Sequence, residues 1–204
     1  MVRDKKVRIA VLVSGGGTNL QALIDSQKSG VIKSGEIVLV LSNKADAYSL
    51  ERAKNAGIPA VAVTKAEFGD DFENKIMETL LENNIDLIVL AGFMCILSKD
   101  FTDRFKNRII NIHPSLIPSF CGEGFYGLRV HRAALEKGVK VSGATVHFVN
   151  EIPDGGEIIM QKAVEVMEGD TPETLSTRIL ENAEWKILPL STELVCEKIL
   201  NNQI

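Results

Sequence analysis

The sequence predicts an α/β fold: a doubly wound, mostly parallel sheet with antiparallel strands in its C-terminal part. Short apolar runs alternate with amphipathic helical segments through the first half of the chain, which is typical of βαβ units with right-handed crossovers. The runs are almost continuously apolar, as strands buried on both faces are. Residues 142–149 and 157–166 are joined by a connection too short for a helical crossover, which favours an antiparallel pair.

The first apolar run ends in a glycine-rich segment, as a buried parallel strand followed by a tight turn does. The later runs are bounded by glycine, proline or polar residues. Between them, apolar residues recur at a spacing of three or four, which indicates helices. The predicted strands are residues 7–13, 36–42, 60–63, 86–91 and 108–112, and the predicted helices are residues 19–28, 49–55, 66–82 and 101–105.

The second half has a different pattern. A loop with three glycines covers residues 119–127, and a helix is predicted over residues 129–137. Residues 171–200 are helical in pattern, but Pro189 should break or kink this helix because proline lacks the N–H that an interior position needs. We find no internal repeat, low-complexity segment or linker.

The composition excludes several classes of protein. The 204 residues are 45% hydrophobic and carry a formal net charge of −4, without a basic stripe for nucleic acid. No apolar stretch approaches the ~20 residues that cross a bilayer, so no membrane association is expected. Cys95, Cys121 and Cys196 lie far apart and lack metal-ligand spacing. We therefore expect free thiols, a cytoplasmic location and no bound metal.

A glycine-rich turn, residues 14–19, joins the first predicted strand to the first predicted helix. Glycines there let the backbone approach a ligand closely, and the free N–H groups of a helix start favour an anion. Leu20 stands where the third glycine of a dinucleotide fingerprint belongs, so we expect a single phosphate. The alternative is a turn that uses glycine only for its geometry. The residues expected to contact the substrate here are Gly16, Gly17, Thr18 and Asn19.

Asn111 and His113 end the last strand of the first half. Residues two apart on a strand point to the same side, so an amide and an imidazole face the ligand crevice together. An amide N–H that donates to a developing oxyanion is worth ~2.7–4 kcal/mol of barrier. A histidine near neutral pKa moves a proton or, when charged, stabilises the oxyanion. The alternative is a polar strand end with a satisfied histidine.

Asp154 lies in the turn Pro153-Asp154-Gly155-Gly156, and His147 is on the preceding predicted strand. An aspartate beside a histidine raises the proton affinity of the histidine and orients its ring. Asp-Gly is also a strong turn dipeptide, and spacing alone does not bring Asp154 to His113. The sequence has neither a nucleophile elbow nor a cluster with metal-ligand spacing, which favours direct transfer between bound substrates.

Recognisable motifs follow one another along nearly the whole chain. They are Val-Leu-Val-Ser-Gly-Gly-Gly-Thr-Asn-Leu-Gln-Ala (11–22), Ser-Asn-Lys-Ala-Asp-Ala (42–47), Leu-Ala-Gly-Phe-Met (90–94), Asn-Ile-His-Pro-Ser-Leu-Ile-Pro (111–118) and Val-His-Phe-Val-Asn-Glu-Ile-Pro-Asp-Gly-Gly (146–156). In this order they closely resemble the phosphoribosylglycinamide formyltransferases, which are folate-dependent glycinamide ribonucleotide transformylases. The combination is highly specific, unlike any one of these motifs alone.

The resemblance implies a Rossmann-like formyltransferase fold and a step of purine biosynthesis. The formyl group of the co-substrate 10-formyltetrahydrofolate would pass to the amine of glycinamide ribonucleotide through an oxyanionic tetrahedral intermediate. We expect one formyltransferase domain over residues 1–204. Its nucleotide-phosphate-binding half would be residues 1–113 and its folate and catalytic half residues 114–204. Both partners would be small molecules, and the protein would be a monomer or a homodimer.

The resemblance also implies roles for particular residues. Asn111 and His113 would stabilise the oxyanion, and Asp154 would pair with His113 and help to move the amine proton. The glycine-rich turn would hold the nucleotide phosphate, Pro114 would line the substrate site and Glu184 would bind the ribose. The expected folate contacts are Phe93, Met94, Cys95, Ile96, Leu97, Asn111, Asn150, Glu151, Ile152, Pro153 and Asp154.

The chain departs from the family pattern in three places. Cys95 stands where many members carry an arginine, which bears on the folate contacts. The stretch 119–127 is longer than the usual turn and is either a lid or a longer surface loop. Glu184 is followed by Trp185 instead of histidine, and its spacing from Arg178 is one residue longer than usual.

Three other functions stay open at this point. Formyltetrahydrofolate deformylase, in which water is the acceptor, shares the Asn-His-Asp core but normally carries an N-terminal regulatory domain, whereas this chain starts at the first predicted strand. Methionyl-tRNA formyltransferase adds a C-terminal β-domain and a basic surface. A non-catalytic nucleotide-phosphate-binding module would leave the Asn-His-Asp set unexplained.

Overall fold

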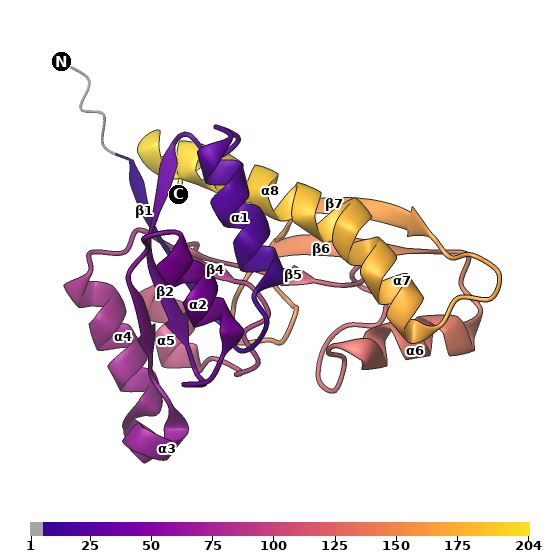
Figure 1. Ribbon diagram of the computed structural model, residues 1–204, viewed down its shortest axis with the longest axis horizontal. Coiled ribbons are helices and arrows are strands. Elements are labelled where there is room, and N and C mark those ends of the chain that lie inside the picture. Colours follow the sequence, from indigo (N-terminus) through magenta and orange to yellow (C-terminus); the bar gives the residue numbers. More distant parts are fainter. Residues whose placement is uncertain (1–5) are drawn as a thin grey trace.

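A seven-stranded sheet in the order β3-β2-β1-β4-β5-β6-β7 forms the centre of the protein (Figure 1). The computed structural model describes residues 6–204. Strands β1 to β5 pair in parallel, whereas β5 with β6 and β6 with β7 pair antiparallel, which confirms the predicted fold class. The strands are β1 (Val7–Val13), β2 (Gly35–Ser42), β3 (Ala60–Ala62), β4 (Leu87–Leu90), β5 (Ile109–His113), β6 (Val141–Phe148) and β7 (Ile158–Glu165).

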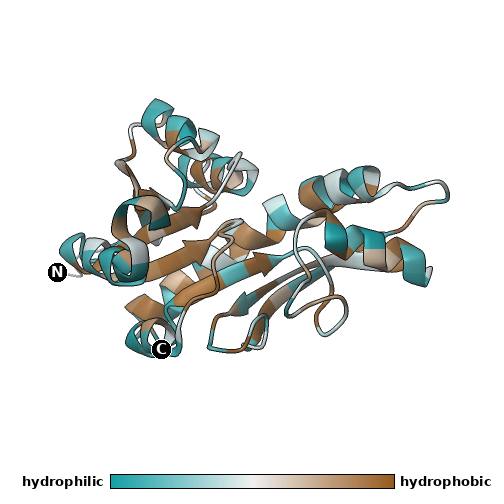
Figure 2. Ribbon diagram, turned by 90° about the horizontal axis from the view of Figure 1, so that it is seen from below, coloured by the Kyte–Doolittle hydropathy of each residue, from teal (hydrophilic) through white to brown (hydrophobic). Residues whose placement is uncertain are grey.

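Helices cover both faces of the sheet and divide the core into two clusters. One cluster contains Leu20 and Leu23 of α1 with Leu188 of α8, and the other contains Ile76 of α4 and Phe101 of α5. Figure 2 shows the hydrophobic strands between helices that carry hydrophilic residues. The helices are α1 (Thr18–Lys28), α2 (Tyr48–Asn55), α3 (Lys65–Phe68), α4 (Phe72–Glu82), α5 (Lys99–Arg104), α6 (Leu128–Lys137), α7 (Pro172–Ile179) and α8 (Trp185–Leu200).

The prediction of one continuous helix over residues 66–82 is wrong. The segment is divided into α3, a short 3-10 turn η1 (Gly69–Asp71) and α4. Gly69 has a φ of 55°, which lies outside the helical region, so the backbone changes direction there. The apolar periodicity continues on both sides of Gly69, and for that reason it did not reveal the break.

The interruption of the C-terminal helical segment also lies elsewhere than predicted. It is a π-helical segment, η2 (Leu180–Glu184), between α7 and α8, whereas Pro189 lies within α8. Ile187, Leu188 and Val195 of α8 are buried around Pro189. Their packing sustains the helix although one backbone hydrogen bond is missing.

The parallel strands bring three loops to one edge of the sheet. β1, β4 and β5 are neighbours, so the segments that follow their carboxyl ends lie side by side, where ligands of open α/β sheets bind. The backbone N–H of Met94, after β4, donates to Oγ of Ser14, after β1, at 2.8 Å.

Among the described residues, no helix is long and apolar enough to span a membrane. All three cysteines are free thiols.

Candidate active site

Asn111 of β5 and His147 of β6 lie directly opposite each other in the antiparallel register. Their side chains therefore share one face, and Nδ2 of Asn111 is 3.2 Å from Nε2 of His147. The other ring nitrogen of His147, Nδ1, is 2.8 Å from the carbonyl oxygen of Phe148, which can only accept, so Nδ1 carries the proton. In the neutral ring Nε2 then accepts from Asn111 and fixes the orientation of the amide.

Asp154 lies in a tight turn between β6 and β7. The N–H of Gly155 donates to the carbonyl oxygen of Ile152 at 2.9 Å, and Asp154, third in this turn, has a φ of 56°. Proline in second place and a left-handed residue in third place are typical of a type II turn, and aspartate tolerates that conformation. A Cβ on Gly156 would lie 1.7 Å from the Phe148 carbonyl oxygen, so only glycine lets the chain return to β7 here.

The turn brings the Asp154 carboxylate to two histidines. Oδ2 is 3.4 Å from Nδ1 of His113, and Oδ1 is 3.5 Å from Nε2 of His147. The structure therefore supplies the contact between Asp154 and His113 that sequence spacing left open.

Two backbone groups of the loop 119–127 complete this arrangement. The carbonyl oxygen of Phe120 is 2.9 Å from Nε2 of His113, and the N–H of Gly122 donates to Oδ2 of Asp154 at 2.8 Å. Because a carbonyl only accepts, Nε2 of His113 carries a proton, and Nδ1 of the neutral ring presents its lone pair beside the carboxylate. Nδ1 is therefore the atom that can take up a proton.

Burial and neighbouring charges set the protonation states of this pair. Burial lowers the pKa of His113, whereas Asp154 and the Phe120 carbonyl act in the opposite direction. Burial would raise the pKa of Asp154, but His147, His113 and the Gly122 amide hold this pKa below its usual value. An ionised carboxylate therefore stands beside a neutral imidazole at neutral pH, which is a suitable resting state for a proton acceptor.

The glycine-rich turn between β1 and α1 leaves a helix start open. Gly17 is the N-terminal cap of α1, has a φ of 72° and provides no side-chain hydrogen bond to the first turn. A Cβ on Gly17 would lie 2.6 Å from Cβ of Ser49, so glycine permits the close approach of this turn to α2. Nε of Arg52 donates to the Gly16 carbonyl at 2.7 Å and supports the turn, and Gly16 and Thr18 are exposed.

Asn19 and Glu184 connect this turn to the C-terminal helical segment. Nδ2 of Asn19 donates to Oε2 of Glu184 at 2.7 Å, and both side chains are buried. Burial raises the pKa of Glu184, and the bond from Asn19 opposes this effect. Oδ1 of Asn19 is buried without a hydrogen-bond partner among residues 6–204. The π-helical segment η2 accommodates the extra residue between Arg178 and Glu184, since a π turn holds more residues than an α turn.

The two segments predicted to bind folate lie on different loops. After β4, Phe93 and Leu97 are buried, whereas Met94 and Ile96 are 53% and 75% exposed. Sγ of Cys95 accepts a hydrogen bond from Nδ2 of Asn43 at 3.0 Å. In the β6–β7 connection, the side chain of Ile152 is 59% exposed.

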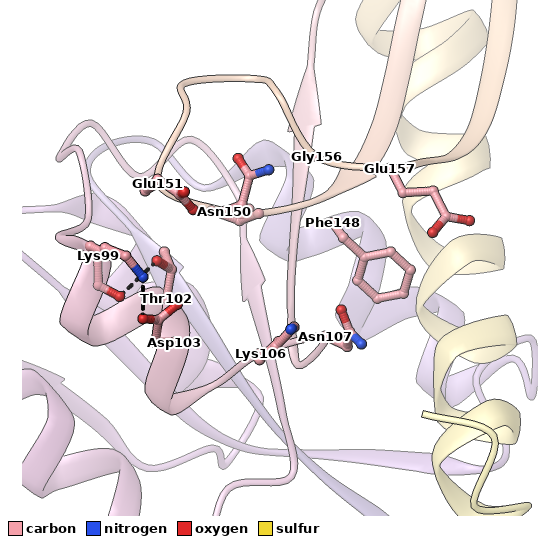
Figure 3. Close-up of a pocket in the computed structure, with 11 residues that line it drawn as sticks. Lys99, Thr102, Asp103, Lys106, Asn107, Phe148, Asn150, Glu151, Gly156 and Glu157 are labelled. Atoms are coloured by element: carbon pink, nitrogen blue, oxygen red, sulfur yellow. Dashed lines mark hydrogen bonds and ion pairs between the residues drawn. The ribbon is translucent and has the colours of Figure 1, made fainter.

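A cavity of about 360 Å³ lies between α5 and the β6–β7 connection (Figure 3). It shares Asn150 and Glu151 with the predicted folate segments but contains none of Asn111, His113 and Asp154. Its walls carry side chains of both charges, and Lys99 pairs with Asp103 within it. This cavity is therefore not the centre of the predicted chemistry.

Sequence reasoning missed three contributors to this site. The sequence shows His147 only as a residue upstream of Asp154, and strand register alone places it opposite Asn111. Phe120 and Gly122 take part through backbone groups, for which residue identity gives no signal.

Pro114, which was predicted to line the substrate site, is half-buried directly after β5. In the described part of the chain, no three or more His, Cys, Asp or Glu side chains are grouped to hold a metal ion.

The bond between Asn111 and His147 leads to a prediction. Replacing His147 by leucine removes the acceptor and frees the Asn111 amide to turn, so kcat should fall roughly tenfold or more. Steady-state kinetics of the His147→Leu variant would measure this loss. In an Asn111→Ala background the same substitution should have a smaller effect, because residues that act through one another are not additive. The effect that remains would come from the contact of His147 with Asp154. Full additivity in this double-mutant cycle would contradict the assignment.

The comparisons with known proteins identify the family of this chain. A formyl transferase family model matches residues 7–192. Phosphoribosylglycinamide formyltransferase of Haemophilus influenzae is 46% identical over 185 residues, which are 90% of this chain and 84% of that protein. The trifunctional purine biosynthetic protein adenosine-3 of Gallus gallus is 47% identical over 196 residues, and the chain spans only 19% of its length.

A solved structure is similar in both sequence and fold. Glycinamide ribonucleotide transformylase 1 from Symbiobacterium toebii has a TM-score of 0.88 and 46% sequence identity, covering 94% of this chain and 88% of that one. Sequence and fold therefore lead to the same assignment. The chain belongs to the formyl transferase family, among the phosphoribosylglycinamide formyltransferases.

Proposed function

We propose that this chain transfers the formyl group of 10-formyltetrahydrofolate to the amine of glycinamide ribonucleotide, and that Asn111, His113 and Asp154 carry the chemistry. One observation carries the proposal. The Asp154 carboxylate lies 3.4 Å from His113, which shares a strand and a face with Asn111. The names of the relatives supply the substrate.

The proposed reaction begins when the substrate amine attacks the formyl carbon. The Asn111 amide, held by His147, donates its second N–H to the oxygen that becomes negative. Nδ1 of His113 accepts the proton that the amine loses, and Asp154 stabilises the resulting imidazolium. His113 then returns the proton to the folate nitrogen as its bond to the formyl carbon breaks. Each proton and bond is accounted for without a covalent enzyme intermediate.

The nucleotide would lie along the glycine-rich turn. The uncapped start of α1, with Gly16, Gly17 and Thr18 around it, suits the phosphate. Glu184 offers a carboxylate and Asn19 a buried, unpartnered carbonyl oxygen, and both accept hydrogen bonds from ribose hydroxyls.

The folate would lie between the two loops that follow β4 and β6. Met94, Ile96 and Ile152 offer exposed apolar surface for a ring system, and the backbone groups of both loops offer donors and acceptors. Cys95 lacks the guanidinium group with which an arginine at this position would pair with a folate carboxylate. Its sulfur accepts a hydrogen bond from the side chain of Asn43. Recognition by this chain therefore depends on shape and backbone groups at that position.

Removal of the Glu184 carboxylate tests the ribose assignment. In Glu184→Ala, the KM for glycinamide ribonucleotide should rise about tenfold while kcat changes little, because the contact is the same in the ground and transition states. Glu181, an exposed residue of the same π-helical segment, supplies the control Glu181→Ala. If both variants raise KM equally, or if neither does, Glu184 does not bind the nucleotide.

One assay separates the proposed function from its alternatives. Tetrahydrofolate formation from 10-formyltetrahydrofolate is followed with and without glycinamide ribonucleotide. Turnover that requires the nucleotide supports the transferase. Equal rates in both reactions would establish the deformylase, and no turnover in either would favour the non-catalytic binding module.

We also propose that the whole chain acts as one formyltransferase domain. It would work in the cytoplasm, as a monomer or a homodimer, with small-molecule partners and without a metal. The acidic balance of charge, net −4, suits this role better than binding to nucleic acid.

A further inference from the structure

The loop 119–127 contacts the predicted catalytic pair from two sides. The Phe120 carbonyl lies 2.9 Å from Nε2 of His113, and the Gly122 N–H donates to Asp154 at 2.8 Å. Both groups belong to the backbone, so their positions depend on how the loop itself is held. A loop without internal support would let both contacts open.

Phe125 provides support to both of these loop residues. Its ring lies edge-on to the ring of Phe120, with centroids 6.4 Å apart and an interplanar angle of 63°. Its backbone N–H donates to the Gly122 carbonyl at 3.1 Å and closes a tight turn. Phe125 is half-buried, and Phe120 packs in turn against the main core cluster.

Phe120 needs such support because its backbone is strained. Its φ of 51° is left-handed, which is unfavourable for a bulky side chain and persists only where the surroundings impose it. An aromatic edge-to-face pair stabilises the folded state beyond the area that it buries, and this stabilisation opposes the cost of such a conformation. The ring of Phe125 is therefore placed to hold the conformation that presents the Phe120 carbonyl.

We propose that Phe125 is a positioning residue, which holds the Phe120 carbonyl on His113 and the Gly122 amide on Asp154. The inference rests on the proposed formyl transfer, because it assigns Phe125 a role in aligning that chemistry. The Phe120 carbonyl keeps the proton of neutral His113 on Nε2 and leaves Nδ1 free. Without this contact the ring would divide between two tautomers, and only one of them offers Nδ1 as the acceptor.

Replacement of Phe125 by alanine should therefore affect turnover more than binding. We expect kcat to fall at least about tenfold while both KM values change by less than about threefold, since small misplacements of reacting groups are costly. Phe125→Tyr, which keeps the ring, should stay within about twofold of the unchanged protein. Tyr126→Ala is the matched control: Tyr126 is the adjacent aromatic residue, but it is exposed and stacks with Arg129.

A second measurement reports on the contact itself without any turnover. The ¹⁵N NMR shifts of the His113 ring should indicate a single tautomer, with the proton on Nε2, in the unchanged protein and in Tyr126→Ala. In Phe125→Ala they should indicate a mixture. Phe125→Leu keeps apolar bulk without the ring and replaces the alanine variant in both measurements if that variant does not fold.

Loss of kcat together with a mixed tautomer, in the Phe125 variant alone, supports the proposal. An unchanged kcat, a single tautomer in Phe125→Ala, or an equal loss in Tyr126→Ala overturns it. Failure of the proposed function is a separate result, because the unchanged protein would then show no transfer to glycinamide ribonucleotide. The ¹⁵N shifts of His113 would still show whether Phe125 fixes the tautomer of its ring.

Discussion

Asp154→Asn is expected to lower kcat by at least ~10²-fold, the lower end of general acid–base contributions. The amide keeps the size of the side chain and its contact with the Gly122 N–H, but it cannot balance the charge of a protonated His113. The imidazolium that forms as the amine loses its proton would then stand in a buried site without a counter-charge, and the barrier rises.

The pH dependence of this variant should move in a definite direction. Neutral His113 is the active form, and burial lowers its pKa, so the acid limb of kcat/KM should lie below the ordinary histidine pKa of about 6.5. Asp154 opposes that shift and raises the pKa of His113. Its removal should therefore move the acid limb to still lower pH, while the maximum rate falls.

Rate profiles between about pH 4 and pH 9 would measure both effects. Asp25→Asn, which neutralises an exposed carboxylate on α1, should leave the rate and the profile unchanged. Near-normal turnover in Asp154→Asn would reject the role of Asp154. An acid limb that moved to higher pH would show that a group other than His113 controls it.

Asn111→Ala should lower kcat by roughly 10²–10³-fold, which corresponds to the ~2.7–4 kcal/mol of one lost oxyanion donor. The KM for glycinamide ribonucleotide should change little, because the oxygen gains its negative charge only as the transition state forms. The loss should exceed that of His147→Leu, since Asn111 would donate to the oxyanion directly, whereas His147 orients this amide.

Single-turnover measurements with saturating folate would isolate the chemical step in this variant. Asn74→Ala, which removes an exposed amide on α4, is the control for a general effect of the substitution. A loss of less than about tenfold would mean that the oxyanion is stabilised mainly by other groups. Equal increases in KM and decreases in kcat would assign Asn111 to binding as well as to catalysis.

The sequence predicted the parallel sheet and the edge at which the site lies, because buried strands and turn residues follow local rules. The glycine-rich turn and the pair of Asn111 and His113 could be placed in this way. The contact of Asp154 with His113 could not, because it depends on the antiparallel register of β6 and on a left-handed φ in the turn that follows.

The remaining departures have equally specific causes. Apolar spacing is the same on both sides of Gly69, so periodicity did not reveal the break between α3 and α4. Nor did it reveal η2, the interruption that ends at Glu184, whereas the helix is not broken at Pro189, which lies within α8. The backbone contacts of Phe120 and Gly122 arise from the conformation of the loop and have no signature in residue type.

The hydrogen bond between Asn19 and Glu184 joins residues 165 positions apart in the chain. The surface proposed to face the nucleotide is therefore complete only when one of the last helical segments has docked beside the first helix. During synthesis on the ribosome, the N-terminal strands and their glycine-rich turn would emerge long before this partner. A nascent chain would gain the ability to bind the nucleotide only late in its synthesis. Bound nucleotide would then favour the docked arrangement by mass action and protect both segments from proteolysis.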